Sequence, residues 1–103
     1  MPLTGFITCK SADEAHKIAS ELLKKRLVTC ANIVKEISSS YWWHGKIENA
    51  EESLVIIKTR TGLESKIIKE TKKHHSYALP AIEFIKTETD RETKNWILKE
   101  TTQ

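Results

Sequence analysis

The sequence predicts an α+β sandwich, in which two helices cover one face of an antiparallel sheet. Strand-like and helix-like patterns alternate in the order β-α-β-β-α-β-α, and the strand-helix-strand pattern that starts at Leu3 starts again at Leu54. Four consecutive aliphatic residues, 54–57, predict an interior strand that is covered on both faces. Right-handed crossovers turn this order into the arrangement called ferredoxin-like. No linker divides the 103 residues, so we expect a single domain over residues 1–103.

The first half of the chain supplies a strand and a capped helix. Residues 3–9 alternate between two faces and predict the strand. A Ser-x-x-Glu capping box at residues 11–14 begins the helix, and basic residues at its end suit the helix dipole. The predicted apolar stripe of this helix consists of Ala15, Ile18, Ala19, Leu22 and Leu23.

The second half repeats this pattern and adds a helix. A second capping box at residues 61–64 begins a helix that ends at His75. Pro80 returns the chain to an extended state, so residues 81–87 form the last strand. A third capping box at residues 89–92 predicts a short C-terminal helix.

Between the halves lies a long hairpin over residues 33–58, whose first arm opens within residues 27–34. His44 and Gly45 lie where the chain reverses, and Gly45 can adopt the positive φ of a tight turn. Each arm of about a dozen residues spans about 40 Å, whereas helices of about 15 and 13 residues span only about 20 Å each. The distal part, with the aromatic residues 41–43, therefore lacks cover from its own chain. Since such a ribbon is unstable alone, we expect other copies of the chain to cover it.

Composition and charge exclude several classes of protein. The 17 basic and 14 acidic residues are interspersed and give a net charge of +3, which indicates a solvated surface and no nucleic-acid partner. No apolar run approaches the roughly 20 residues of a membrane span, and the start lacks the regions of a signal peptide. Two cysteines make no disulfide framework. We expect a reduced cytoplasmic protein without a membrane partner.

One end of the predicted domain gathers possible metal ligands. Cys9 closes the first strand, and His74 and His75 close the second helix, so chain direction places all three at the same end. A thiolate and imidazoles suit copper, zinc or another borderline-to-soft cation. Cys30 falls at the opposite end, roughly 20 Å away and beyond the ~7 Å reach of a disulfide.

The same three residues also fit purely structural roles. Cys9 is also typical of a small buried residue, and His74 and His75 also suit the C-terminal dipole of a helix. Adjacent histidines point about 100° apart on a helix, so both can bind one ion only where the helix has frayed.

Enzymatic and RNA-binding functions find little support. The three glycines are isolated, so no phosphate loop is present. A nucleophile pair of Cys9 and His75 has no evident orienting carboxylate, and the predicted strand over residues 54–58 lacks the stacking aromatics of an RNA-binding sheet. We therefore expect a protein that is not an enzyme. The aromatic residues Tyr41, Trp42, Trp43 and Trp96 predict packing or subunit contacts, or the lining of a ligand cleft.

Motifs across nearly the whole chain fall in a specific order, at residues 8–9, 25–34, 40–47, 52–59, 75–80 and 96–97. In this order they resemble the CutA divalent-cation tolerance family. The resemblance implies a ferredoxin-like fold, a cytoplasmic location and an association with copper and other divalent cations. It also implies a tight homotrimer in which long hairpins pack across subunits, similar to PII signalling proteins. By position it implies Cys9, His74 and His75 as copper ligands, whereas Ala78 and Ala81 stand where the family often has acidic residues.

Two functional hypotheses follow. The first is a trimeric cytoplasmic protein that binds copper or similar cations and contributes to metal-ion tolerance. The alternative is a PII-like signalling module that binds a small ligand or a partner protein in clefts between subunits. The residues expected in those clefts are Tyr41, Trp42, Trp43, Lys58, Tyr77 and Trp96.

Overall fold

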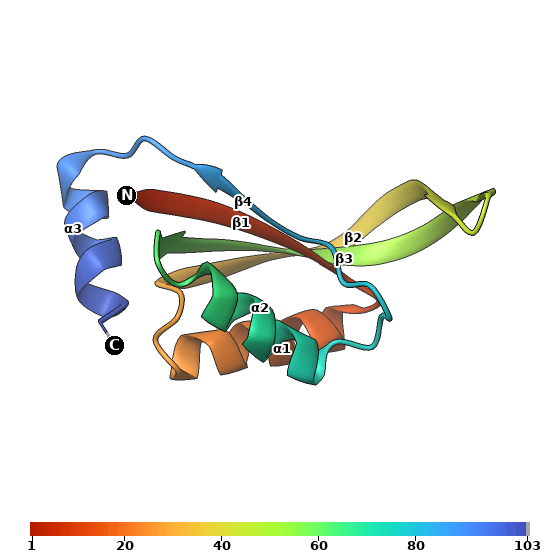
Figure 1. Cartoon of the computed structure of the whole chain (residues 1–103), viewed down its shortest axis with the longest axis horizontal. Helices are drawn as coiled ribbons and strands as arrows, with labels where there is room; N and C mark the ends of the chain where they lie inside the picture. Colours follow the sequence, from red (N-terminus) through yellow and green to blue (C-terminus); the bar gives the residue numbers. More distant parts are fainter. Residues whose placement is uncertain (103) are drawn as a thin grey trace.

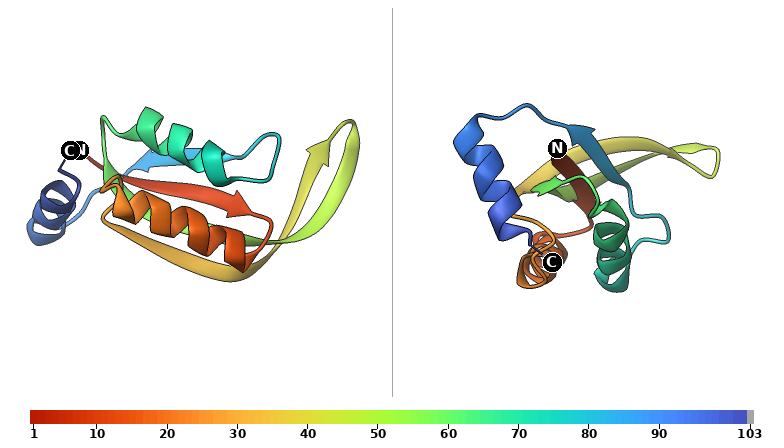
Figure 2. Two further views of the ribbon diagram at one scale, coloured as in Figure 1. Left: turned by 90° about the horizontal axis from the view of Figure 1, so that it is seen from below. Right: turned by 60° about the vertical axis from the view of Figure 1, so that its left-hand side comes forward.

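The computed structural model describes residues 1–102 and confirms an α+β fold with a four-stranded antiparallel sheet and three helices (Figure 1). The sheet has the strand order β2-β3-β1-β4, and α1 and α2 lie on the same face of it (Figure 2). The elements are β1 (Pro2–Cys9), α1 (Ala12–Lys24), β2 (Cys30–Trp43), β3 (Lys46–Arg60), α2 (Glu64–His74), β4 (Ile82–Lys86) and α3 (Arg91–Glu100).

The core lies between the sheet and the two helices. The alternation predicted for β1 is confirmed, because its alternate residues from Leu3 to Cys9 are buried. The predicted stripe of α1 is confirmed except at Leu23, which is 42% exposed. Leu23 lies next to Leu22 on the helix and therefore turns away from the sheet. Four of the five stripe residues are thus enough to anchor α1.

The interior position of β3 is confirmed, because β3 pairs with both β2 and β1. Its two faces differ. Val55 and Ile57 are fully buried against the helices, whereas Leu54 and Ile56 are only partly buried. Within residues 1–102, α1 and α2 cover only one of the two faces (Figure 2), and cover on the second face stays a prediction.

Two of the predicted helix starts carry a side-chain cap. The Ser11 hydroxyl accepts a hydrogen bond from the Glu14 N–H at 3.2 Å, as the first capping box predicts. At α3 the capping residue is Asp90 instead of Thr89, and its carboxylate accepts from the Thr93 N–H. The predicted start of α3 was therefore one residue too early.

The second predicted capping box is wrong. The N-cap of α2 is Leu63, which has no side-chain capping bond, and the helix begins at Glu64. Gly62 adopts a φ of 103°, which is not helical, so the helix cannot extend back to Thr61. The carboxylate of Glu64, the first residue of α2, instead accepts from the Gly62 N–H at 2.6 Å and so holds the turn that precedes the helix.

The predicted hairpin is confirmed, and it projects beyond the helices (Figure 1). His44 and Gly45 have φ values of 51° and 78°, so they form a two-residue turn of the kind that suits twisted strands. The first arm begins at Cys30, within the residues that were expected to open it. Trp42 is 72% exposed near the tip, because no helix of the described chain reaches it.

A β-bulge interrupts the ribbon where it leaves the helix layer. Pairing shifts between Val34 and Ile37 of β2, so that Lys35 and Glu36 lie opposite the single residue Ser53. The Ser53 hydroxyl donates a 2.6 Å hydrogen bond to the Lys35 carbonyl and fixes the irregular backbone. A bulge bends its strand and increases the local twist. In Figure 2 the distal ribbon curves away from the plane of the sheet.

The third helix lies at the end of the sheet opposite the hairpin tip (Figure 1). Ile97 is its buried residue, and the Arg60 guanidinium donates to both the hydroxyl and the carbonyl of Thr101. Trp96 is 43% exposed at this end. No helix within residues 1–102 has both the length and the apolar character needed to cross a membrane.

Candidate functional site

Three ligand-type side chains meet where β1 ends. The sulfur of Cys9, a carboxylate oxygen of Glu14 and a ring nitrogen of His75 lie within 4.8 Å of one another. Each comes from a different segment: Cys9 from the end of β1, Glu14 from the first turn of α1, and His75 from the residue that follows α2. The fold thus brings residues 9 and 75 together, as chain direction predicted.

The orientation of His75 follows from its place at the end of α2. Its backbone is extended, with φ −90° and ψ 138°, so its side chain does not continue the helical spiral. The ring Nε2 lies 2.7 Å from the Thr8 carbonyl and must donate to it, while Nδ1 accepts from the Tyr77 N–H at 3.1 Å. Both ring nitrogens of His75 therefore have protein partners.

His74 belongs to a different cluster. Its Nε2 lies 3.0 Å from a Glu70 carboxylate oxygen, and ligand atoms of His74, Glu70 and Glu21 lie within 4.8 Å of one another. Since His74 is the last residue of α2 and His75 is already extended, the two side chains leave the helix in different directions. The structure thus groups His75 with Cys9 and places His74 with Glu70.

The Cys9 thiol is held in its protonated form. Burial raises its pKa, and the negative charges of Glu14 and Glu52 raise it further, to about 12. A cation that binds the sulfur must displace this proton, because the thiolate is the ligand form. The nearby carboxylates favour that exchange, since they attract a cation to the same place.

Glu14 supplies the stable negative charge of this cluster. Burial acts to raise the pKa of Glu14, but hydrogen bonds from Ser76 and from the Lys10 N–H, together with nearby His75, keep it below its ordinary value. The Ser76 N–H donates to one carboxylate oxygen at 2.8 Å, and the Lys10 N–H donates to the other at 3.1 Å. Glu14 is therefore an oriented carboxylate beside a neutral thiol.

The second cluster already contains cations. Lys25 lies 2.7 Å from the Glu70 carboxylate, and its hydrogen bond is the main cause that lowers the pKa of Glu70 to about 2, with help from His74 and Lys73. Glu70 is buried between α1 and α2. A metal ion here would have to compete with two ammonium groups, so this cluster is the weaker candidate of the two.

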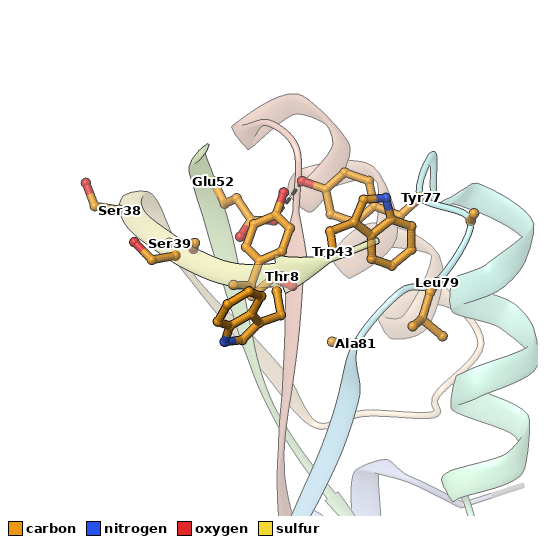
Figure 3. Close-up of a pocket in the computed structure, with 12 residues that line it drawn as sticks. Thr8, Ser38, Ser39, Trp43, Glu52, Tyr77, Leu79 and Ala81 are labelled. Carbon is orange, nitrogen blue, oxygen red and sulfur yellow. Dashed lines mark hydrogen bonds between the residues drawn. The ribbon is translucent and has the colours of Figure 1, made fainter. Parts of the chain in front are cut away.

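A cleft of about 700 Å³ opens beside the first cluster, between the distal ribbon and the segment that links α2 to β4 (Figure 3). The Tyr77 hydroxyl donates to the buried Glu52 carboxylate at 2.7 Å, as the dashed line in Figure 3 shows. The lining residues are Thr8, Ser38, Ser39, Ser40, Tyr41, Trp42, Trp43, Glu52, Tyr77, Ala78, Leu79 and Ala81.

Of the six residues expected in clefts between subunits, Tyr41, Trp42, Trp43 and Tyr77 line this cleft within one chain, and their place between subunits stays a prediction. The other two lie elsewhere. Lys58 pairs with Thr4 and Cys30 within the sheet, and Trp96 is on α3 at the opposite end of the chain (Figure 1).

Sequence reasoning missed two acidic residues of the site. Glu14 was interpreted only as the last residue of a capping box, although its carboxylate also faces His75 at 3.9 Å. Glu52 follows an exposed stretch of the hairpin and precedes four aliphatic residues, so its position at the edge of the predicted core was the available signal.

The fold and the site define a small α+β protein with a candidate cation cluster next to an aromatic cleft. The sequence profile described as "CutA1 divalent ion tolerance protein" matches residues 3–100. The chain therefore belongs to the CutA1 divalent ion tolerance family, whose members are tolerance proteins and not enzymes.

Individual relatives agree with this membership. A divalent-cation tolerance protein CutA from Archaeoglobus fulgidus is 43% identical over 93 residues, which cover 89% of this chain and 90% of that protein. One from Pyrococcus horikoshii is 36% identical over 93% of this chain and 94% of its own. The chain spans only 44% of a rice relative named Protein CutA 1, chloroplastic, at 34% identity over 75% of this chain.

Solved structures of relatives share the whole fold. The periplasmic divalent cation tolerance protein CutA from Archaeoglobus fulgidus superimposes with a TM-score of 0.94 at 40% identity, covering 99% of this chain and all of that one. The protein from Thermus thermophilus gives a TM-score of 0.96 at 33% identity, with the same coverage.

Proposed function

We propose that this chain binds copper or another divalent cation at Cys9, Glu14 and His75 and thereby contributes to metal-ion tolerance. The observation that carries the proposal is the approach of these three ligand atoms to within 4.8 Å. A sulfur, a carboxylate oxygen and an imidazole nitrogen together suit borderline cations such as zinc and copper. The names of the relatives, which refer to divalent-cation tolerance, support the same function.

Cation binding at this cluster requires changes at two of the three ligand residues. The Cys9 proton must leave, and one of the two hydrogen bonds of the His75 ring must break. Glu14 needs no proton change, because its pKa is held below the ordinary value by the hydrogen bonds of Ser76 and Lys10. We therefore expect proton release on cation binding and an affinity that rises with pH.

Adjacent histidines allow a matched test of this site. We expect Cys9→Ala and His75→Ala each to weaken copper and zinc binding at least tenfold, measured by competition with a chelator of known affinity. His74→Ala is the control, since it changes the same residue type one position away in the other cluster. Loss of binding in His74→Ala would show that His74 is a ligand, as the family resemblance implies. Unchanged binding in Cys9→Ala and His75→Ala would refute the site.

The working form that we propose is a cytoplasmic homotrimer. The face of the sheet opposite α1 and α2 carries apolar side chains that are only partly buried or exposed, and the ribbon tip is exposed as well. Both cysteines are free thiols, which suits a reducing compartment. The apolar residues on that face are Phe6, Val34, Leu54, Ile56 and Ile85.

Light scattering tests the assembly directly. We expect a mass of three chains, and we expect Trp43→Glu to impair assembly and folding together, because it adds a charge to the ribbon that sister subunits would cover. Leu23→Glu, at an exposed residue of α1 away from the ribbon, is the control that should still assemble. A folded, soluble monomer of the parent chain would refute the trimer.

A second candidate function is small-ligand sensing of the PII type, and the cleft beside Tyr77 favours it. Its volume of about 700 Å³ lies within the range of roughly 300–1,000 Å³ that small-molecule sites occupy. Thermal shifts across a panel of metals, nucleotides and organic ions separate the two functions, because a cleft ligand should act without Cys9.

A further inference from the structure

We infer that the cleft beside Tyr77 binds a small organic cation, an amine or quaternary ammonium group on an apolar body, between Glu52 and the aromatic side chains of the ribbon. The inference rests on the proposal that this cleft takes a small ligand, and it specifies the chemical class of that ligand. Charge, aromatic content and size of the cleft all contribute to it.

The charge of the cleft is negative. Among its twelve lining residues Glu52 is the only one with a carboxyl group, and none is Lys, Arg or His. The Glu52 side chain is buried, at 7% exposure, and its bond with the Tyr77 hydroxyl neutralises no charge. Glu52 forms no ion pair with any residue within 1–102. Burying a carboxylate without a counter-cation costs free energy. A ligand that brings a positive charge therefore gains the most binding free energy at this position.

The walls of the cleft suit the same kind of ligand. Tyr41, Trp42 and Trp43 line it from the ribbon, and they are 41%, 72% and 39% exposed. The faces of tryptophan and tyrosine rings attract cations, most strongly when the cation is a weakly hydrated organic ammonium. A ligand that covers these rings would also remove exposed apolar surface from water.

The same features disfavour anions. A phosphate or carboxylate ligand would meet no cationic side chain in the cleft, and it would approach Glu52 with Glu14 nearby, since both carboxylates act on the Cys9 thiol. A nucleotide is therefore a poor fit for this cleft. Leu79, Ala78 and Ala81 supply an apolar border that would contact the uncharged body of an amine (Figure 3).

Three probes of similar size but different charge test the inference: benzyltrimethylammonium, neutral benzyl alcohol and anionic phenylacetate. Each is titrated into the assembled full-length protein, and binding is followed through the three tryptophan indole N–H signals in ¹⁵N spectra. We expect benzyltrimethylammonium to shift the signals of Trp42 and Trp43 and to bind at least tenfold more tightly than the other two. The Trp96 signal should stay in place, because Trp96 belongs to α3, which lies at the opposite end of the sheet from the hairpin tip (Figure 1).

Two variants identify the groups responsible. Glu52→Gln keeps the size of the side chain but removes the charge, and should weaken binding of the cation at least tenfold without affecting benzyl alcohol. Its matched control is Glu48→Gln, an exposed carboxylate on the same strand outside the cleft, which should bind normally. Trp42→Ala removes one ring of the cleft and should also weaken binding of the cation severalfold, with light scattering showing that the variant assembles as the parent does.

The outcomes distinguish two claims: that the cleft binds a small ligand, and that this ligand is a cation. Equal binding of all three probes at Trp42 and Trp43 would overturn the cationic ligand while supporting a ligand cleft. If none of the probes shifts these signals, the small-ligand function fails as well, and a sister subunit is the occupant of the cleft. Cation binding that persists in Glu52→Gln would overturn the role of the carboxylate.

Discussion

Replacing Tyr77 with phenylalanine removes one hydroxyl from the cleft and should destabilise the folded protein measurably. The hydroxyl donates at 2.7 Å to the carboxylate of Glu52, which is only 7% exposed, so water cannot fully replace the lost donor. Hydrogen bonds to charged groups contribute about 1.5–3 kcal/mol, and we expect a loss of free energy of unfolding in this range. For a chain of this size it corresponds to a melting temperature lower by on the order of 10 °C.

The assay is denaturation at one fixed protein concentration, since assembly makes stability depend on concentration. Tyr41→Phe is the matched control, because it makes the same change at another tyrosine of the cleft. The Tyr41 hydroxyl forms no hydrogen bond within residues 1–102, so this variant should lie within about 0.5 kcal/mol of the parent.

A double-mutant cycle with Glu52→Gln isolates the interaction between the two residues. Groups in direct contact show coupling energies of about 0.5–3 kcal/mol, whereas independent groups add within about 0.5 kcal/mol. Additive effects of Tyr77→Phe and Glu52→Gln, or equal stability of Tyr77→Phe and Tyr41→Phe, would refute the reasoning.

The pH dependence of stability gives a further check on this hydrogen bond. Burial, followed by the hydrogen bond to Glu52 and its charge, raises the pKa of Tyr77 above the ordinary 10.0, so the folded state retains a proton that the unfolded state loses. The stabilisation is complete below pH 10 and is lost as pH rises above it. Tyr77→Phe should therefore show a shallower alkaline decline than the parent.

Three other predictions concern the sheet and the two clusters. Gly5→Ala places a methyl group 2.8 Å from the Ile57 side chain and should cost about 1–3 kcal/mol in denaturation experiments, and the double variant with Ile57→Ala, which removes the clash, should lose less than the sum of the two single losses. The raised pKa of Cys9, about 12 against 9.0, predicts stability that is complete below pH 9 and lost between pH 9 and 12, so Cys9→Ala should flatten this alkaline loss. The pKa of Glu70, lowered to about 2 from 4.5, predicts stability that is present above pH 4.5 and lost as pH falls toward 2, and Glu70→Gln should flatten that acid loss.

The periodic spacing of apolar residues made the fold predictable from the sequence. The alternate residues of β1 and the apolar stripe of α1 are buried because periods of 2 and 3.6 place them on one side of each element. The turn at His44 and Gly45 was equally predictable, since few residues tolerate the positive φ that a two-residue hairpin requires. These signals are local and need no knowledge of neighbouring segments.

The site was less predictable because it depends on where elements end and bend. Chain direction brings Cys9 and His75 to the same end, but the separation of His74 from them depends on a helix that stops between the two histidines. The contact between Glu52 and Tyr77 depends on a segment 25 residues away, and the bulge that bends the ribbon beside it has no local sequence signal. Periodicity alone carries no information about such contacts.

The bulge at Lys35 and Glu36 also has a consequence for the direction of the distal ribbon. Because both residues lie opposite Ser53, the extra residue is accommodated at one point, and the pairs on either side of it, Val34 with Leu54 and Ile37 with Glu52, keep the same alternation of faces. Deleting Lys35 would therefore leave each aromatic side chain on its present face of the ribbon, yet it would remove the local bend and the extra twist. A single inserted residue thus aims the ribbon without changing which side chains share a face.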